Sequence, residues 1–371
     1  MSVPGRVAFA GSTADQMAAL WAAQSRGWGR LADGLAALRR ARARALDLNG
    51  ATLLLQSNPA RLVSTGAKID AASVAARPCF LCPPHLPPEQ QALCYHGRPD
   101  SASSAGDDRG GRADEDGWLI LCNPAPIFEP HFVLTYTRHE PQRAAPVLAL
   151  MLNLARDLQG AYTTFYNGPL CGASAPDHLH VQAVPSGLLP FERELIAALD
   201  AGANPPAGTA VPATLASGSP GQPEKGVRPM PLDWLRIGPV RIGVTTPPYR
   251  SAVVLVGADA TTMLAAIREV LSTIGAIHPA EPEPMVNLLA TCRDGEWLVT
   301  VFPRVKHRPA AYGHGADQFL VSPGCLDLGG VLIVPRSEDF DRMTPGLAAA
   351  FLNEVLLPPS ELARLARAIR G

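Results

Sequence analysis

The stretch YNGPLCGASAPDHLHVQAVP, residues 166–185, joins a glycine-rich turn to a run in which polar and apolar side chains alternate. Successive side chains of a β-strand point to opposite faces, so His178, His180 and Gln182 share one face and the apolar residues between them share the other. The apolar row can anchor the strand in a core, while the polar row is displayed in steps of about 7 Å. The pattern therefore predicts a half-buried strand whose open face carries two imidazoles and an amide.

The turn before this strand has the composition of an anion-binding site. Gly168 and Gly172 allow close approach of the backbone to a ligand, and Ser174 adds a hydroxyl group. A polar face turned to solvent is the alternative, but the neighbouring turn favours a functional strand. A neutral imidazole held beside a phosphate can attack phosphorus and later pass the phosphoryl group to a second acceptor. We expect His180, at the middle position, to be this nucleophile.

The glutamine limits the chemistry of the site. Gln182 can donate a hydrogen bond from its amide but cannot carry a proton. Poor leaving groups need a general acid, whereas pyrophosphate and sugar phosphates leave without one. The pattern thus favours exchange between phosphorylated partners.

Three segments carry a resemblance to a known superfamily. GASAPDHLHVQ, residues 172–182, resembles the signature of the transferase branch of the histidine-triad superfamily, in which glutamine takes the last position of His-x-His-x-His. This branch includes the ATP adenylyltransferases (diadenosine tetraphosphate phosphorylases), the GDP-hexose phosphorylases and the galactose-1-phosphate uridylyltransferases. NPAPIFEPHFVLTYTRH (123–139) is similar to the strand pair that lines their nucleotide pocket, and VNLLATCRDGEWLVTVFPR (286–304) resembles a second-half segment of the adenylyltransferases.

The resemblance implies an α/β (α+β) fold of histidine-triad-like antiparallel sheets with flanking helices, in two related halves. It implies that His180 is the nucleophile with His178 beside it, that Gln182 and Ser174 contact the α-phosphate together with the Gly172 turn, and that Asn123 lies near the ribose or base. The implied enzyme is a nucleotidyltransferase or phosphorylase. Its donor would be a dinucleoside polyphosphate or a nucleotide sugar, and its acceptor phosphate or a sugar phosphate. A nucleotide hydrolase and a non-catalytic nucleotide-binding module are the alternatives.

Cys79 and Cys82, in RPCFLCPPH, have the spacing of a metal half-site, which needs two further ligands for tetrahedral zinc. Resemblance to histidine-triad hydrolases and uridylyltransferases implies that His139 and His178 complete a structural zinc site. A pair of buried thiols is the alternative, His85 is a rival ligand, and the resembled adenylyltransferases need no such metal.

A second cationic cluster lies in FPRVKHRPAAY, residues 302–312. We expect Arg304, Lys306 and Arg308 to bind the second phosphorylated substrate, because guanidinium groups make bidentate phosphate contacts. A solvated strand end is the alternative. Arg61 and Lys68 are weaker candidates of the same kind.

Composition limits the partners. The 371 residues include 32 Lys and Arg against 33 Asp and Glu, so no global field attracts nucleic acid or an anionic membrane. The longest apolar run is too short to span a bilayer, and seven scattered cysteines argue against a disulfide framework. We expect a cytoplasmic protein that binds nucleotide and phosphate substrates, with a homodimer left open.

The predicted organisation has four parts. Residues 1–50 form an N-terminal helical segment, with one helix over 14–48, and residues 51–200 form the catalytic half with a mobile insert at 98–117. A linker rich in Pro, Gly and Ala follows at 201–228, and a second related half spans 229–371. The expected elements are two strands within 51–70, two within 118–139, strands near 234–243, 252–256, 286–291, 297–302 and 329–334, and helices at 142–159, at 260–274 and at the C-terminus.

Overall fold

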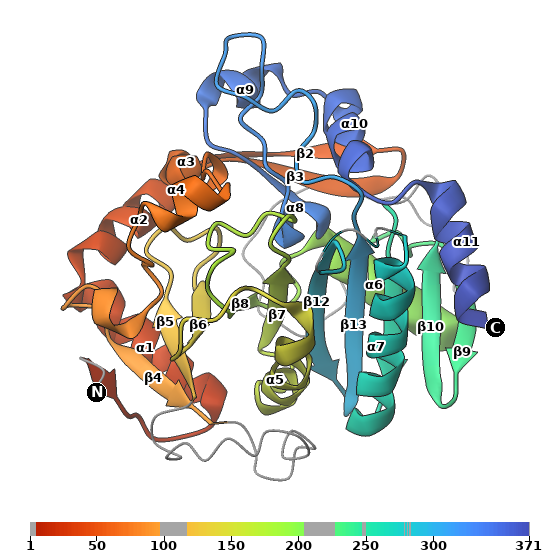
Figure 1. The fold of residues 1–371 in the computed structure, drawn as a ribbon, viewed down its shortest axis with the longest axis horizontal. Coiled ribbons are helices and arrows are strands. Elements are labelled where there is room, and N and C mark those ends of the chain that lie inside the picture. Colours follow the sequence, from red (N-terminus) through yellow and green to blue (C-terminus); the bar gives the residue numbers. More distant parts are fainter. Residues whose placement is uncertain are drawn as a thin grey trace.

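The computed structural model describes residues 5–96, 117–203, 227–246, 250–277, 279, 281 and 283–370 (Figure 1). The insert predicted at 98–117 and the linker predicted at 201–228 lie almost entirely outside these residues. The described part has the mixed α/β architecture that the sequence predicts, with helices packed on an antiparallel sheet. The domain boundaries stay predictions.

One large sheet organises the molecule. Its eleven strands are ordered β1-β4-β5-β6-β8-β7-β12-β13-β11-β10-β9, and the neighbours are antiparallel except for β1 and β4. The strands are β1 (Arg6–Val7), β4 (Ala92–Tyr95), β5 (Trp118–Cys122), β6 (Phe132–Tyr136), β7 (Tyr162–Asn167), β8 (His180–Pro185), β9 (Leu232–Ile237), β10 (Val240–Thr245), β11 (Val253–Gly257), β12 (Val286–Arg293) and β13 (Glu296–Pro303).

The two ends of this sheet repeat one topology. From the outer strand inward, β4-β5-β6-β8-β7 in the first half corresponds to β9-β10-β11-β13-β12 in the second. Helix α5 (Ala144–Asp157) connects β6 to β7, as α7 (Ala260–Gly275) connects β11 to β12. The halves meet where β7 pairs with β12, so an approximate two-fold axis passes between these two strands.

A smaller sheet and further helices complete the fold. The small sheet is ordered β14-β3-β2, from β14 (Val331–Val334), β3 (Ala51–Ser57) and β2 (Arg42–Leu48). The other helices are α1 (Thr13–Gly27), α2 (Gly29–Arg39), α3 (Leu62–Thr65), α4 (Ala71–Ala75), α6 (Pro190–Ala203), α8 (Cys325–Leu328), α9 (Ser337–Arg342), α10 (Pro345–Val355) and α11 (Pro359–Arg370), with 3₁₀ turns at Pro59–Arg61 and Pro83–His85.

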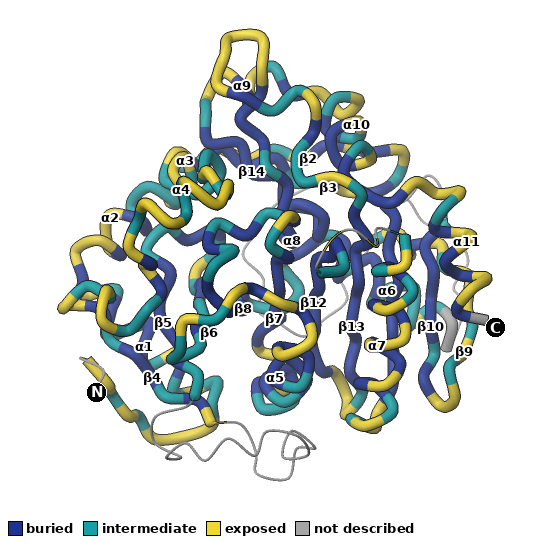
Figure 2. The backbone as a smooth tube through the Cα atoms, in the orientation of Figure 1, coloured by how far each residue is buried: buried dark blue, intermediate teal, exposed yellow. Residues whose placement is uncertain are grey.

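Two apolar cores lie on opposite faces of the large sheet, and its central strands are mostly dark blue in Figure 2. Leu179, Val181 and Ala183 enter the core shared with α1, α2, α5 and α7. Val184 and Phe165 enter the other core, which the small sheet and α8 to α10 cover. This alternation confirms the two-faced strand for residues 180–185 and places His180 and Gln182 on the face toward the small sheet. The prediction is wrong for His178, which lies in a bend before β8, and the face that carries His180 is largely buried and not open.

The helix predicted over residues 14–48 is wrong in its C-terminal part. It is two helices, α1 and α2, which end by Arg39, and the following RARALDL forms β2. The buried side chains of β2 are Leu46 and Leu48, two residues apart as on one face of a strand, and β2 pairs along its length with β3. Asn49 (φ 57°) and Gly50 (φ 94°) form the two-residue turn between them, so this pair marks a hairpin and not a helix end.

The second strand expected after Asn58 is also wrong. Residues 59–61 form a 3₁₀ turn that continues into α3, and Pro59 stands at its first position. Proline fixes the backbone angle of a first helical turn and lacks only an N–H that such a turn leaves unused.

Candidate functional site

His180 and Gln182 lie in β8 at the centre of the first half. Gln182 is placed between Val133 of β6 and Phe165 of β7, and His180 lies opposite Thr135 of β6. Toward the open ends of these strands the Gln142 side chain is inserted between β7 and β8. Its Nε2 donates to the carbonyl oxygens of Asn167 (3.0 Å) and His180 (2.9 Å), and its Oε1 accepts from the His180 amide (2.8 Å). Gln142 therefore fixes the backbone of His180.

The tautomer of His180 is set by its own strand. Nδ1 lies 2.8 Å from the carbonyl oxygen of His178, and because a carbonyl only accepts, Nδ1 carries the proton. Nε2 has no hydrogen-bond partner among the described residues, yet it is not sealed from solvent. Burial of the ring lowers the pKa of His180, so the imidazole is neutral near pH 7. Nε2 is therefore unprotonated and has its lone pair available.

His131, which the sequence analysis missed, sets the amide of Gln182. The backbone N–H of Ile127 donates to Nδ1 of His131 (3.3 Å), so the ring proton is on Nε2, which donates to Oε1 of Gln182 (3.0 Å). Burial lowers the pKa of His131 to about 3, so it stays neutral. The Gln182 oxygen is thus occupied and its NH₂ group, without a partner in the described chain, is turned away from His131.

The predicted turn 168–174 lies at the same end of the sheet. Gly172 has φ +91°, and a Cβ there would come within 2.7 Å of Cα of Gly324, so only glycine fits. Ser174 is half-buried, and its hydroxyl makes no hydrogen bond to any described residue. The turn is preceded by Asn167, whose side chain the sequence analysis also missed. Its signal was a polar residue at the end of a buried strand, directly before a glycine.

Asn123 lies beside this arrangement. Its Oδ1 accepts from the amide of Ala125 (3.0 Å), and its Nδ2 is 3.5 Å from Nε2 of His131. Arg61, a weaker candidate in the sequence, donates from Nη1 to the carbonyl oxygen of Ala125 (3.0 Å). Burial lowers the pKa of Arg61 to about 10, and its charge contributes to the lowered pKa of His131. One cation therefore lies near the Gln182 end of the site.

The three predicted cations of the second half have different surroundings. Arg304 is fully buried, and all five of its N–H groups are bonded, to the carbonyl oxygens of Val355, Pro323, Lys306 and His307 and to Oδ1 of Asn287. Lys306 is exposed and pairs with Glu354. Arg308 donates from Nε to Ser322 and from Nη2 to Ala67, and its Nη1 makes no hydrogen bond to the part of the chain that the structure describes. This favours a supporting role for Arg304, and its phosphate contact stays a prediction.

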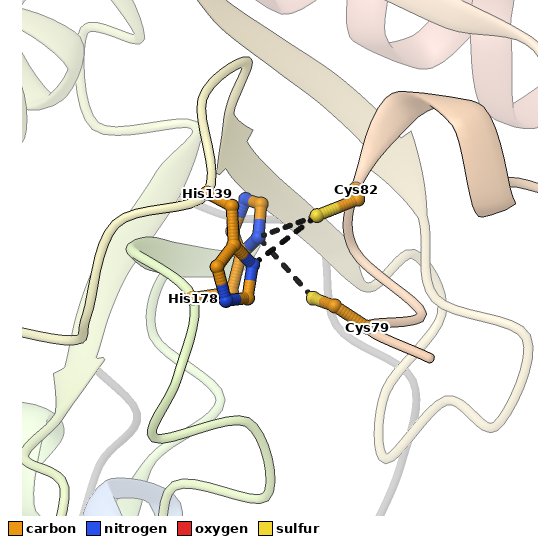
Figure 3. Close-up of side chains that lie close together, drawn as sticks. All are labelled: Cys79, Cys82, His139 and His178. Carbon is orange, nitrogen blue, oxygen red and sulfur yellow. Dashed lines mark hydrogen bonds between the residues drawn. The ribbon is translucent and has the colours of Figure 1, made fainter. Parts of the chain in front are cut away.

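The cysteine pair meets two histidines, as Figure 3 shows. The ligand atoms of Cys79, Cys82, His139 and His178 all lie within 4.8 Å of one another. Sγ of Cys79 is 3.3 Å from Nδ1 of His178, and Sγ of Cys82 is 3.2 Å from Nδ1 of His139 and 3.5 Å from that of His178. This cluster could bind a metal ion.

Its geometry fits zinc. Two ligands of a tetrahedral zinc ion, one sulfur and one nitrogen, are separated by about 3.5 Å when the metal bonds have their usual lengths. Nε2 of His178 lies 2.8 Å from the carbonyl oxygen of Tyr136, the partner that orients a metal-binding imidazole. Burial lowers the pKa of His178 to about 4, which keeps it in the neutral form that binds metal. The rival ligand His85 is turned to the carbonyl oxygen of Cys79 (2.8 Å).

Both halves of the chain match known families. Residues 20–100 and 107–185, which include the histidine strand, match the family described as a domain of unknown function (DUF4922). Residues 250–370 match the family described as GDPGP1-like, C-terminal domain. No curated protein matches the sequence. The GDPGP1-like match of residues 250–370 agrees with the resemblance to the transferase branch.

Solved structures with a similar fold include yeast Ap4A phosphorylase Apa2, which is 17% identical over 90% of this chain and 95% of that chain, with a TM-score of 0.48. The same enzyme in complex with Ap4A is 17% identical over 90% of this chain and 98% of that chain, with a TM-score of 0.46. A uridylyltransferase mutant is 11% identical over 89% of this chain and 99% of that chain, with a TM-score of 0.34.

Proposed function

We propose that the protein transfers a nucleotidyl group from a phosphorylated donor to a phosphorylated acceptor through a covalent intermediate on His180. The observation that carries the proposal is the state of the His180 ring, which is neutral, has its tautomer fixed by the His178 carbonyl and has a free Nε2. Most buried polar atoms have a hydrogen-bond partner, so an accessible ring nitrogen without one favours a role in binding or chemistry. Here the second nitrogen is left for a substrate.

The reaction has two displacements at the α-phosphorus. In the first, the lone pair of Nε2 attacks phosphorus, a P–N bond forms, and the bond to the bridging oxygen breaks with its electrons on the departing nucleoside polyphosphate or sugar phosphate. In the second, an oxygen of the acceptor phosphate attacks, and the P–N electrons return to Nε2. His180 keeps its Nδ1 proton throughout, because the His178 carbonyl holds it.

The surrounding donors suit the transition state. The free NH₂ of Gln182 and the hydroxyl of Ser174 can donate to the oxygens of the α-phosphate, with backbone amides of the turn at Gly172. Asn123, next to His131, would contact the ribose or the base. Since amides and hydroxyls of this kind do not protonate a leaving group, the donor is a phosphoanhydride such as a dinucleoside polyphosphate or a nucleotide sugar.

For the acceptor phosphate, we propose Arg308 and Lys306 as contacts, with Arg304 holding the backbone that carries them. Arg308 is half-buried, with its guanidinium 4.0 Å from the centre of the Tyr312 ring, so its free Nη1 is held in one place. The Cys79, Cys82, His139 and His178 cluster would hold zinc. When bound, the ion would tie the 79–82 segment to the residues that open β8, a structural contribution.

Location and assembly stay predictions. Within the described ranges, every helix is too short or too polar to cross a bilayer. A cytoplasmic location and a homodimer are parts of the same proposal.

The test is the adduct itself. Incubation with a donor labelled at the α-phosphate, without acceptor, should give a protein adduct that is acid-labile and base-stable, as a phosphoramidate is. His180→Ala should abolish both the adduct and turnover while leaving donor binding largely intact. An adduct that persists in His180→Ala, or inversion at phosphorus over the complete reaction, would overturn the double displacement, because two in-line displacements restore the starting configuration.

The alternatives separate in the same assay. A hydrolase releases nucleotide at the same rate with and without added phosphate, whereas a phosphorylase or transferase depends on the acceptor. A binding module binds the donor and forms no covalent species.

A further inference from the structure

Asn287 of the second half contacts the catalytic turn of the first. It lies in β12, paired with Asn167 of β7 across the junction of the two halves, and it is fully buried. Its Nδ2 donates to Oδ1 of Asn167 (2.7 Å) and to the carbonyl oxygen of Cys171 (2.6 Å). Asn167 precedes the turn and Cys171 is the residue before Gly172, so the amide group of Asn287 holds both ends of the segment 167–171.

Arg304 settles which way this amide points. Its Nη1 donates to Oδ1 of Asn287 (2.8 Å), and a guanidinium has no acceptor, so the Asn287 oxygen must face Arg304. The NH₂ group of Asn287 is thereby turned toward Asn167 and Cys171. The remaining N–H groups of Arg304 are bonded to backbone carbonyl oxygens, which leaves the guanidinium no alternative position.

The orientation is passed on to Asn167. Its Oδ1 accepts from Nδ2 of Asn287 and also from the backbone amide of Cys325 (2.7 Å), so both lone pairs of that oxygen are used. Nδ2 of Asn167 has no partner in the described chain, yet it is not sealed from solvent. By the register of β7 and β8, this residue lies across from His180, where Gln142 bridges the two carbonyl oxygens.

We propose that Asn287, locked by Arg304, is a positioning residue for nucleotidyl transfer: it turns the NH₂ of Asn167 toward the phosphate attacked by His180 and fixes the backbone at Cys171. The proposal rests on the proposed function. It also accounts for the second half, in which β13 takes the place of β8 but carries Leu298 and Thr300 and no histidine. In this proposal the second half orients the side chain of Asn167 through Asn287 and Arg304.

Three variants separate positioning from folding. Asn287→Asp keeps an oxygen for Arg304 and the size of the side chain, but removes both N–H groups that face the turn. Asn287→Ser also removes the two N–H groups that face the turn, because the shorter side chain has no amide, and it adds no charge. Leu289→Ala is the matched control, since Leu289 is on the same strand and face, equally buried, and paired with Phe165 away from the turn.

Single-turnover formation of the His180 adduct gives two numbers, an amplitude and a rate. A displacement of about 1 Å at a reacting centre costs on the order of 100-fold in rate. We expect Asn287→Asp and Asn287→Ser to keep most of the amplitude and to lose about 30-fold or more in rate. Leu289→Ala should lower the melting temperature and leave the rate within about 3-fold. A normal rate with reduced amplitude in the Asn287 variants would show a structural role and overturn the proposal.

A second readout separates this inference from the proposed function. If the wild-type protein forms no adduct, the double displacement fails, and the affinity for a nucleoside monophosphate, measured by calorimetry, decides the role of Asn287. We expect Asn287→Ser to weaken binding by about 10-fold, the loss of one well-placed hydrogen bond. Unchanged affinity would overturn the positioning role on its own.

Discussion

The carbonyl oxygen of His178 accepts the Nδ1 proton of His180 at 2.8 Å, while the His178 ring itself lies in the Cys/His cluster, 3.3 Å from Sγ of Cys79. His178 thus joins the Cys/His cluster to the proposed nucleophile through three backbone atoms. Loss of the cluster would release the carbonyl that holds the tautomer of His180. Stability and chemistry are coupled at this point.

The cluster should hold about one zinc ion per chain, because two thiols and two imidazoles converge there and the sulfur–nitrogen distances of 3.2 to 3.5 Å suit a tetrahedral ion. Cys82→Ser should lose the metal, lower the melting temperature and slow adduct formation. Elemental analysis and thermal unfolding measure this. Cys94→Ser, a half-buried cysteine of β4, is the control and should keep the metal. Protein from zinc-replete medium that has reduced thiols and no stoichiometric metal would contradict the prediction.

His131→Phe should lower kcat by about 10- to 100-fold with little change in the KM of the donor, because the ring still packs on Phe165 but no longer holds the Gln182 oxygen. Since burial lowers the pKa of His131 to about 3, the residue does not titrate between about pH 5 and pH 8. The ratio of wild-type to variant rates should therefore stay constant over this range. A ratio that changes with pH would show that His131 transfers a proton.

Arg304→Ala and Arg308→Ala should differ in kind. Removal of the Arg304 guanidinium leaves five bonds unmade at a buried site, so we expect a loss of about 3 kcal/mol or more in the free energy of unfolding. Arg308→Ala should instead raise the KM of the acceptor far more than that of the donor. Chemical denaturation and steady-state kinetics on both variants check this. Equal effects of Arg308→Ala on the two KM values would remove its assignment.

Asp327 should make the protein less stable as pH rises from about 4 to 6. Burial raises the pKa of this carboxyl to about 6, from an ordinary 3.8, so the folded state holds the proton more tightly than the unfolded chain. The stabilisation from this proton is complete below the unfolded pKa and lost above the folded one. Between pH 5 and pH 7 the loss is about 1 kcal/mol.

Asp327→Asn measures this contribution. The variant should be less stable overall, since one of the amides of Gly324 and Ile333 loses its acceptor. The wild-type free energy of unfolding, from urea titrations, should fall by about 1 kcal/mol more than that of the variant between pH 5 and pH 7. Parallel curves for the two proteins would contradict the raised pKa.

The sequence correctly predicted those helices and strands that bury one face at a regular spacing of residues. The two-residue period of β8 and the helical periods of α5 and α7 are present in the structure because each element buries one face on the large sheet. The same reasoning failed at Arg42–Leu48, where an Arg and Ala composition favours a helix but pairing with β3 makes a strand. Tertiary pairing decided that segment, not propensity.

The site was accessible from the sequence only where its residues carry a local signal. His178, His180 and the CxxC spacing are visible in the chain, and the resemblance supplied His139. Asn287 is 120 residues from Asn167, and no pattern around either predicts that one orients the other. His131 stands in a segment that was recognised as a strand pair, but its bond to Gln182 depends on the register of β6 and β8.

A two-residue turn, Asp294 and Gly295, joins β12 to β13 in the second half. In the first half, the corresponding strands β7 and β8 are separated by the longer segment 168–179. If His180 forms the proposed adduct, we expect one nucleotide equivalent per chain, since the described second half has a two-residue turn and no histidine at the equivalent position. A fragment ending before β12 would expose the backbone edge of β7 to any available strand. Such a fragment is expected to form a dimer in which β7 pairs with β7 of a second copy, in place of its pairing with β12 of the same chain.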